Sequence, residues 1–160
     1  MSAPGKPDDT VDDGLLVPFG REELDLFVAL REGYCRDDNA PFDLVETRRC
    51  FQELVGPAAG LGRGFFIRND GTMVGYVVLT FGFSFEHGGR DAIVDEIYVR
   101  ASDRRQGLGR RALEAIEALA RRQGVRAIHV ETRRSNPGAF RLYERLGYVP
   151  RPSVFSSKKL

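Results

Sequence analysis

The stretch DAIVDEIYVRASDRRQGLG, from Asp91 to Gly109, decides the fold, because it passes from a strand through a polar turn into a helix. Its first part is rich in β-branched, aromatic and aliphatic residues, which are typical of a buried strand, and we predict that strand from Ile93 to Val99. A helical pattern begins at the end of the stretch, at Gly107-Leu108-Gly109. The sequence therefore predicts a strand, a glycine-containing turn and a helix in direct succession.

This turn has the properties of an anion-binding site. The first backbone N–H groups of a helix have no partner within the helix, and the helix macrodipole adds partial positive charge there. Arg104 and Arg105 add formal positive charge, and the glycines at Gly107 and Gly109 let phosphate oxygens approach the backbone without meeting a Cβ atom. The turn therefore suits a pyrophosphate.

Three kinds of phosphate-binding loop compete as interpretations of the turn. A Walker A loop requires Gly-Lys-Ser/Thr, and neither Lys nor Ser follows these glycines. The dinucleotide-binding pattern G-x-G-x-x-A matches residues 107–112, and Glu131 stands roughly 20 residues further on, where a ribose-binding acid is expected. That pattern places its first glycine directly after the strand, however, whereas residues 100–106 intervene here. The third interpretation is R-x-x-G-x-G, read from Arg104 to Gly109 after the strand sequence EIYV.

Hydrophobic periodicity predicts one α/β domain over residues 14–160, preceded by a disordered acidic tail over residues 1–13. Since a helix joins the central strand to the strand that follows it, these two strands are expected to be parallel. In chain order we expect a strand Leu15–Phe19, a helix from Arg21 that Gly33 ends, a loop Tyr34–Pro41, a helix Phe42–Val55, strands Phe65–Ile67 and Met73–Phe83 joined by the turn Asn69-Asp70-Gly71, the central strand, a helix Leu108–Gln123, a strand Val125–Thr132, a helix after Asn136 and a last strand Val154–Lys159.

Composition indicates a soluble globular protein, which we expect to be cytoplasmic. Of the 160 residues, 42% are hydrophobic and 29% are charged, no apolar run has the length of a membrane span, and the N-terminal residues lack a signal-peptide pattern. Cys35 and Cys50 have no metal-ligand spacing, so we expect free thiols and no metal site.

Charge is unevenly divided along the chain. Residues 100–151 carry 13 arginines against 5 acidic residues, a net charge of +8, and the remainder carries −7 because the whole chain carries +1. This division suits an enzyme that joins a polyanionic cofactor to a cationic acceptor, although surface charge also segregates by chance. The arginines lack interleaved aromatic residues and a recognition motif, so we expect neither a nucleic-acid nor a membrane partner.

A second motif lies downstream, in the sequence NPGAFRLYERLGY from Asn136 to Tyr148. Locally it predicts a short helix with Asn136 as N-cap, Pro137 at the first position and Gly147 just past the end. As a string it resembles the signature N-x-x-A-x-x-L-Y-E-x-x-G-F/Y of the GNAT family of N-acetyltransferases. The upstream R-x-x-G-x-G resembles the acetyl-CoA pyrophosphate loop of the same family, and together the two motifs extend the resemblance over residues 65–149.

The resemblance implies the GNAT fold, an α/β fold with a mixed, mostly antiparallel sheet and helices on both faces. Two parallel strands of this fold splay apart, and acetyl-CoA lies in the gap. The N–H groups of Ile97, Tyr98 and Val99 would polarise the thioester carbonyl, and Asn136 would contact the pantetheine arm. The pyrophosphate would be bound by Arg104, Arg105, Gln106, Gly107, Leu108, Gly109 and Arg110.

The resemblance also implies that Tyr143 is the general acid that protonates the departing thiolate. A structural role competes with this one, because Tyr143 shares a predicted helix face with Ala139 and Leu146, as core residues do.

A protonated amine must lose a proton before it attacks, and Asp95 and Glu96 are the candidate bases. Neighbouring strand residues face opposite ways, so only one of the two reaches the site unless a bulge intervenes. Asp95 stands where the polyamine-acetylating branch of the family carries Glu, and Glu96 stands where it carries the following Asp. The shorter Asp95 side chain puts direct base action in doubt, and either residue could instead accept backbone N–H groups.

The predicted function is therefore transfer of an acetyl group from acetyl-CoA to a primary amine of a small molecule by direct attack. A polyamine, an amino acid, an antibiotic amine, and a protein N-terminus or lysine are all compatible acceptors. The alternatives are a CoA-binding sensor without catalysis and a dinucleotide-dependent enzyme. The sequence leaves the oligomeric state open, a homodimer included.

Overall fold

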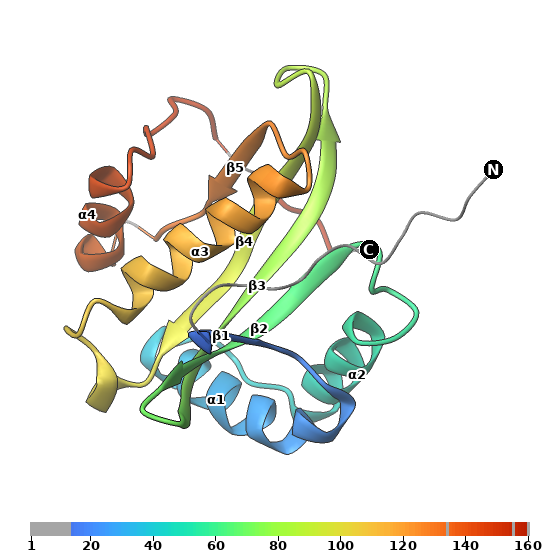
Figure 1. Ribbon diagram of the computed structural model, residues 1–160, viewed down its shortest axis with the longest axis vertical. Helices are drawn as coiled ribbons and strands as arrows, with labels where there is room; N and C mark the ends of the chain where they lie inside the picture. Colours follow the sequence, from blue (N-terminus) through green and yellow to red (C-terminus); the bar gives the residue numbers. More distant parts are fainter. Residues whose placement is uncertain (1–13, 134, 155, 160) are drawn as a thin grey trace.

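The computed structural model of the protein describes residues 14–133, 135–154 and 156–159, and in this part of the chain it contains a five-stranded sheet in the order β1-β2-β3-β4-β5 (Figure 1). All neighbouring strands are antiparallel except β4 and β5, which are parallel. The elements are β1 (Leu16–Pro18), η2 (Arg21–Glu23), α1 (Leu24–Asp37), α2 (Leu44–Leu54), β2 (Gly62–Asn69), β3 (Thr72–Ser84), β4 (Gly89–Val99), η3 (Ala101–Asp103), α3 (Leu108–Arg122), β5 (Ala127–Val130) and α4 (Pro137–Arg145).

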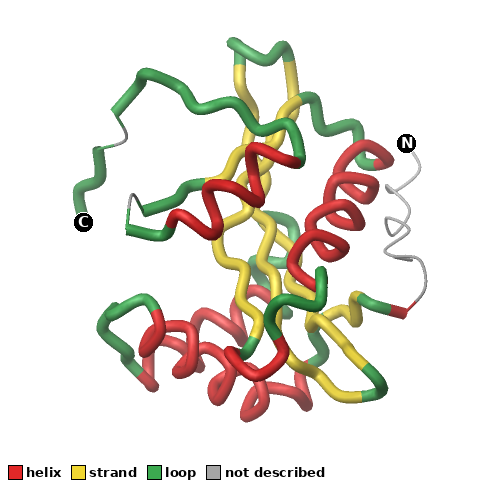
Figure 2. The backbone as a smooth tube through the Cα atoms, turned by 90° about the vertical axis from the view of Figure 1, so that its left-hand side faces the viewer, coloured by secondary structure: helices red, strands yellow, loops and turns green. Residues whose placement is uncertain are grey.

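Helices cover both faces of the sheet, as predicted (Figures 1 and 2). On one face α3 and α4 pack over a core that includes Val77 and Leu79 of β3, and on the other face α1 and α2 pack over Tyr76 and Val78 of the same strand. This alternation follows from the two-residue period of a strand, and it explains why β3 is apolar on both sides. The predicted mixed α/β fold with a parallel strand pair is confirmed.

The β2–β3 hairpin confirms the turn predicted at Asn69-Asp70-Gly71. Asn69 pairs with Thr72, so the loop has two residues, and both Asp70 and Gly71 have positive φ (46° and 79°). This is the geometry of the turn that best matches the twist of a hairpin. No helix within the described residues combines the length and the apolar character that a membrane crossing needs.

The prediction that Gly33 ends the first helix was wrong, and with it the predicted loop Tyr34–Pro41. Helix α1 continues through Gly33 to Asp37. A Cβ atom at Gly33 would lie 2.6 Å from the hydroxyl of Tyr98, so the glycine allows a close approach between α1 and β4. The helix ends just before Asn39, which has a φ of +50°.

The predicted last strand, Val154–Lys159, was also wrong for the residues that the structure describes there. Val154 and residues 156–159 belong to no strand, and Phe155 lies outside the described residues, as does the predicted tail over residues 1–13. Val154 is 88% exposed, and the four-residue strand β5 offers only a short edge for a further strand. The alternation of a few residues was too weak a signal to predict a partner strand.

Candidate active site

The parallel strands β4 and β5 pair over only part of their length. Pairing joins residues Asp91–Val94 to Ala127–Val130, and β5 ends there. Strand β4 continues to Val99 and remains paired with β3 on its other edge. From Asp95 onward, the β4 edge that faced β5 is therefore without a sheet partner among the described residues, and this is the splay that the resemblance implied. A ligand with amide groups can add to such an edge as a further strand does.

A β-bulge lies at the start of this split. Glu96 pairs with Val78, but Val94 pairs with Leu79, so Asp95 is an extra residue without a partner in β3. The bulge reverses the alternation along β4. Val94 packs in the core beneath α3, Glu96 bonds toward α1, and Ile97 packs again on the α3 side. A bulge therefore does intervene at Asp95 and Glu96, so the rule that neighbouring strand residues face opposite ways does not hold for this pair.

The Glu96 carboxylate is held through both oxygens. Oε1 accepts a hydrogen bond from Arg31 Nη2 (3.0 Å), and Oε2 accepts one from the Tyr76 hydroxyl (2.7 Å). Arg31 Nη1 also donates to Thr47 Oγ1 (2.8 Å) in α2. The Glu96 side chain is only 15% exposed. A carboxylate with both oxygens engaged is poorly placed to receive a proton from a substrate.

Asp95 is in a different situation. Its side chain is exposed, and it makes no hydrogen bond or ion pair with any residue of the described ranges. Partial desolvation, and then the negative charge of Glu96, raise the pKa of Asp95, while Arg31 opposes this effect and Glu131 adds to it. An unengaged carboxylate with a raised pKa has the chemistry of a general base.

The side chain of Tyr143 is 8% exposed and packs in the core beneath α3, as the packing interpretation predicted. Burial raises the pKa of Tyr143, and an interaction with Thr132 partly offsets this. Thr132 follows the end of β5 by two residues, so the contact brings the phenol to the β5 side of the split. Asn136 caps the helix that carries Tyr143, with Oδ1 accepting from Ala139 N–H (3.1 Å). Packing and proton donation are therefore compatible roles for Tyr143.

The predicted anion-binding turn is open in front of α3. Arg105 and Gly107 have positive φ (64° and 76°), and α3 begins at Leu108. Among the described residues, a Cβ atom at Gly107 would meet nothing within 4 Å, and one at Gly109 would meet only Leu142, at 3.7 Å. The space that these two glycines leave clear lies at the N-terminus of a 15-residue helix, where a phosphate group is stabilised.

Other side chains of the turn are engaged within the protein. Arg104 Nε donates to the Val99 carbonyl (2.8 Å), and its guanidinium bonds to the carboxylate of Asp37 at the end of α1. Gln106 accepts from an asparagine of the β2–β3 turn (3.2 Å), and Arg110 pairs with a glutamate one helical turn further on (2.8 Å). In this arrangement the backbone of the turn, more than the Arg104 guanidinium, is presented to an anion.

One residue of α1 near the split, Tyr34, was missed by the sequence analysis. Tyr34 is half-buried, and desolvation followed by the charges of Glu96 and Asp38 raises the pKa of Tyr34 to about 12. Arg133, in the segment between β5 and α4, binds Asp38 through Nε and Oδ2 (3.1 Å). The signal was the helical spacing of Phe27, Leu30 and Tyr34, which extends the apolar face of α1 past Gly33.

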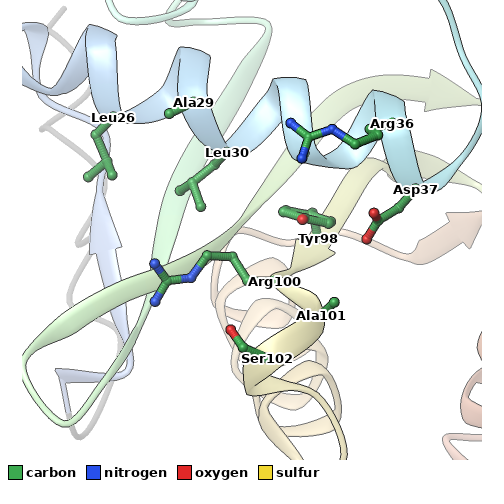
Figure 3. Close-up of a pocket in the computed structure, with 10 residues that line it drawn as sticks. Leu26, Ala29, Leu30, Arg36, Asp37, Tyr98, Arg100, Ala101 and Ser102 are labelled. Carbon is green, nitrogen blue, oxygen red and sulfur yellow. The ribbon is translucent and has the colours of Figure 1, made fainter.

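A hollow of about 370 Å³ lies beside the split, between α1 and the β4–α3 connection (Figure 3). Figure 3 shows Arg36 above the ring of Tyr98 and Asp37 beside it. Tyr98 is the only predicted site residue among those that line the hollow. The carboxylates and the phenol that carry the predicted chemistry do not line this hollow. The split and the α3 N-terminus, not the hollow, therefore form the candidate active site.

The match to known families agrees with this geometry. The family model described as "Acetyltransferase (GNAT) family" matches residues 26–148. The chain belongs to the GNAT family of acetyltransferases. Membership in this family favours the R-x-x-G-x-G interpretation of the turn over the dinucleotide-binding interpretation.

Solved structures share the GNAT fold of this chain, whereas no curated protein matches it. An integron cassette protein from the mobile metagenome of the Cole Harbour salt marsh is 29% identical, with a TM-score of 0.80 over 91% of this chain and 90% of that one. An aminoglycoside N-acetyltransferase in complex with CoA is 16% identical, with a TM-score of 0.76 over 90% and 93%. A predicted acetyltransferase from Clostridium acetobutylicum with acetyl-CoA is 13% identical, with a TM-score of 0.74 over 89% and 94%.

Proposed function

We propose that this GNAT protein transfers an acetyl group from acetyl-CoA to a primary amine of a small molecule. The observation that carries the proposal is the unpaired edge of β4, which begins at the Asp95 bulge and leads to the open N-terminus of α3. The solved structures with acetyl-CoA and with CoA on the same fold support this choice of donor.

The donor would lie along this edge. The N–H groups of Ile97, Tyr98 and Val99 belong to the part of β4 beyond the end of β5, and those on the open edge can bond the amides of pantetheine and the thioester oxygen. The glycine turn would bind the pyrophosphate through backbone N–H groups. Asn136 lies on the α4 side, and its Oδ1 is already occupied as a helix cap, so only its amide nitrogen would reach the donor.

On its way to the amide a protonated amine loses two protons, and the departing thiolate gains one. The amine loses its proton to Asp95, directly or through water, and its nitrogen attacks the thioester carbonyl carbon. A C–N bond forms, the C–S bond breaks, and the electron pair of that bond leaves on sulfur. Tyr143 protonates the thiolate, which gives free CoA, and the nitrogen loses its second proton to solvent, which gives the amide. Tyr143 regains a proton from solvent, so the reaction releases one proton in all. Glu96 takes no part in proton transfer, because both of its oxygens accept hydrogen bonds within the protein.

A cationic small-molecule amine is the acceptor class that the charges favour. Asp95 is unengaged within the described part of the chain, and Glu131 lies near enough to raise its pKa, so the mouth of the split is negative. The sequence around the bulge resembles the polyamine-acetylating branch, and a polyamine is our first candidate. We place the enzyme in the cytoplasm, where the free thiols of Cys35 and Cys50 stay reduced.

Binding of the donor tests the turn first. Saturating acetyl-CoA should raise the melting temperature of the wild-type protein by binding linkage, and NADH should not. Gly109→Val fills the space in front of α3 and should weaken acetyl-CoA binding at least about tenfold by calorimetry, since a side chain would occupy the anion's place. Gly60→Val is the matched control, because a Cβ atom there meets no atom of the described residues within 4 Å, and Gly60 lies far from the turn in sequence. Equal acetyl-CoA affinity in both variants would refute the assignment of the turn.

Replacement of Tyr143 tests the acid. Tyr143→Phe keeps the buried ring and removes only the hydroxyl, so kcat should fall roughly 10- to 1,000-fold while the Kd of acetyl-CoA barely changes. Release of free thiol from acetyl-CoA, measured with a panel of amines, gives the rate. Tyr148→Phe is the control, because its ring lies 5.6 Å from that of Tyr143 on the same side of the molecule. If product release does not limit kcat, an undiminished kcat in Tyr143→Phe would leave Tyr143 with a packing role alone.

A further inference from the structure

Arg31 and Glu96 together link four elements at the bulge of β4. From α1, Arg31 donates to Glu96 in β4 (3.0 Å) and to Thr47 in α2 (2.8 Å). Glu96 accepts in addition from Tyr76 in β3 (2.7 Å). Thr47 is 2% exposed and Tyr76 is fully buried, so most of this polar network lies inside the protein. It is the polar centre of a cluster that is otherwise apolar, with Phe27, Leu30, Phe51 and Phe66 among its members.

Stability alone explains this network poorly. Burying an ion pair removes two charges from water, and well-packed apolar residues of similar volume often stabilise a protein equally or more. The aromatic residues around the network show that the site could hold an apolar group. The network is also located at one particular place, since Glu96 directly follows Asp95, the extra residue of the bulge. A bulge leaves a residue without a ladder partner, so other contacts must fix the direction of its neighbours.

We propose that Arg31 and Glu96 are positioning residues, which fix the bulge so that the Asp95 carboxylate remains unengaged at the mouth of the split. The inference rests on the proposed function, because Asp95 matters only if it receives a proton there. Arg31 and Glu96 act through Asp95 and do not touch the reacting atoms.

The charges around the bulge give this arrangement a measurable signature. The charged groups that act on Asp95 are Glu96 on its own strand, Arg31 on α1 and Glu131 beyond β5. After desolvation, Glu96 is the main cause that raises the pKa of Asp95, and Arg31 lowers it. The groups that face Glu96 are Arg31, Tyr34 and Cys35 of α1, Tyr76 of β3 and Asp95 of β4.

The direct test is the titration of Asp95 by NMR in protein labelled with carbon-13 at aspartate side chains, with the signal assigned through Asp95→Asn. Glu96→Gln keeps the shape of the side chain and removes the neighbouring negative charge, so the Asp95 midpoint should shift to lower pH. Arg31→Met removes the opposing positive charge and should shift it to higher pH. Arg31→Lys keeps the charge and should restore a midpoint close to that of the wild type.

Thr47→Val is the matched control, because it removes a contact of Arg31 without changing any charge. Its Asp95 midpoint should stay at the wild-type value, and the acid limb of kcat/KM against pH should follow the NMR midpoint in every variant. Midpoints unchanged in both Glu96→Gln and Arg31→Met would overturn the proposal, as would the same shift in all variants including Thr47→Val. If Arg31→Met does not fold, Glu96→Gln decides alone. Failure of the wild-type protein to bind acetyl-CoA and to release thiol would instead refute the proposed function. The NMR titration of Asp95 does not depend on activity, so it would still test the roles of Arg31 and Glu96.

Discussion

The substitution Tyr76→Phe removes one hydroxyl, and with it the hydrogen bond to Glu96, which is the neighbour of the candidate base Asp95. Tyr76 lies in the middle of β3, is fully buried, and donates to Glu96 Oε2 at 2.7 Å. Its ring packs edge-on against Phe27, with ring centroids 5.1 Å apart. Phenylalanine keeps this packing and opens no cavity larger than the missing oxygen. The loss therefore comes from the carboxylate oxygen that no longer has its donor.

The size of the effect follows from the charge of the acceptor. A hydrogen bond to a charged group contributes about 1.5–3 kcal/mol to the free energy of unfolding. In a protein of this size, 1 kcal/mol changes the melting temperature by about 2–4 °C, so we expect Tyr76→Phe to lower it by about 3–12 °C at neutral pH.

The same hydroxyl makes a pH-dependent contribution. Burial, followed by the charge of Glu96, raises the pKa of Tyr76 far above its usual range. A group whose pKa is raised in the folded state contributes stability that is complete below the unfolded pKa, at about 10, and that is lost as the pH rises beyond it. Phenylalanine has no such contribution to lose. The difference in unfolding free energy between wild type and Tyr76→Phe should therefore narrow above pH ~10.

Urea unfolding followed by circular dichroism, at about pH 7.5 and at about pH 10.8, measures both effects. Tyr34→Phe is the control: the Tyr34 ring lies 6.4 Å from that of Tyr76, and its hydroxyl makes no hydrogen bond to any residue that the structure describes. At neutral pH we expect a change below about 0.5 kcal/mol for this control. An unfolding free energy of Tyr76→Phe within ~0.5 kcal/mol of wild type, at an unchanged m-value, would refute the network as described.

Two further substitutions test the bulge and the strand packing. Asp95→Asn should raise the melting temperature at pH 7 while it lowers kcat. Desolvation and the charge of Glu96 raise the pKa of Asp95 in the folded state, so the ionised carboxylate destabilises the folded protein at pH 7, and asparagine removes this cost. The gain should vanish near pH 3, below the usual Asp pKa of about 3.9, and a gain that persists there in scanning calorimetry would contradict this reasoning. Gly75→Ala should lower the unfolding free energy by more than about 2 kcal/mol, because its Cβ atom would lie 2.1 Å from the Tyr98 carbonyl oxygen. Stability equal to wild type in urea would contradict that close approach.

Local chemistry made the strand, turn and helix around Gly107 predictable. The donors of a helix N-terminus and the freedom of glycine act within a few residues, so a short stretch contains the whole signal. The same holds for the Asp70-Gly71 hairpin and for the Asn136 cap, both of which the structure confirms. Where contacts within a few residues determine which amino acid is needed at a position, the sequence alone predicted the structure correctly.

Gly33 shows where such reasoning fails. A glycine near the end of a helical pattern favours a helix stop, yet the reason for this glycine is the Tyr98 hydroxyl, which comes from a strand far along the chain. The distinction between Asp95 and Glu96 failed for the same reason. Both are acids on one strand, and only the register with β3 shows which of them is the extra residue of the bulge. Contacts between distant segments decide both cases, and a single sequence does not display them.

Three features that weaken a sheet coincide within a few residues of β4. In the part of the chain that the structure describes, the strand has an open edge from Asp95 onward, a bulge at Asp95, and a mostly buried ion pair at Glu96. Each feature is unfavourable for stability by itself, because open edges lose ladder bonds, bulges disrupt pairing and buried charges lose hydration. Their coincidence has a single explanation if the edge must bind a strand-like donor, the bulge must present one carboxylate, and the ion pair must hold the second carboxylate away. Natural sequences depart from locally optimal choices chiefly at functional sites, and this criterion favours the proposed site at the Asp95 bulge over the hollow beside the split.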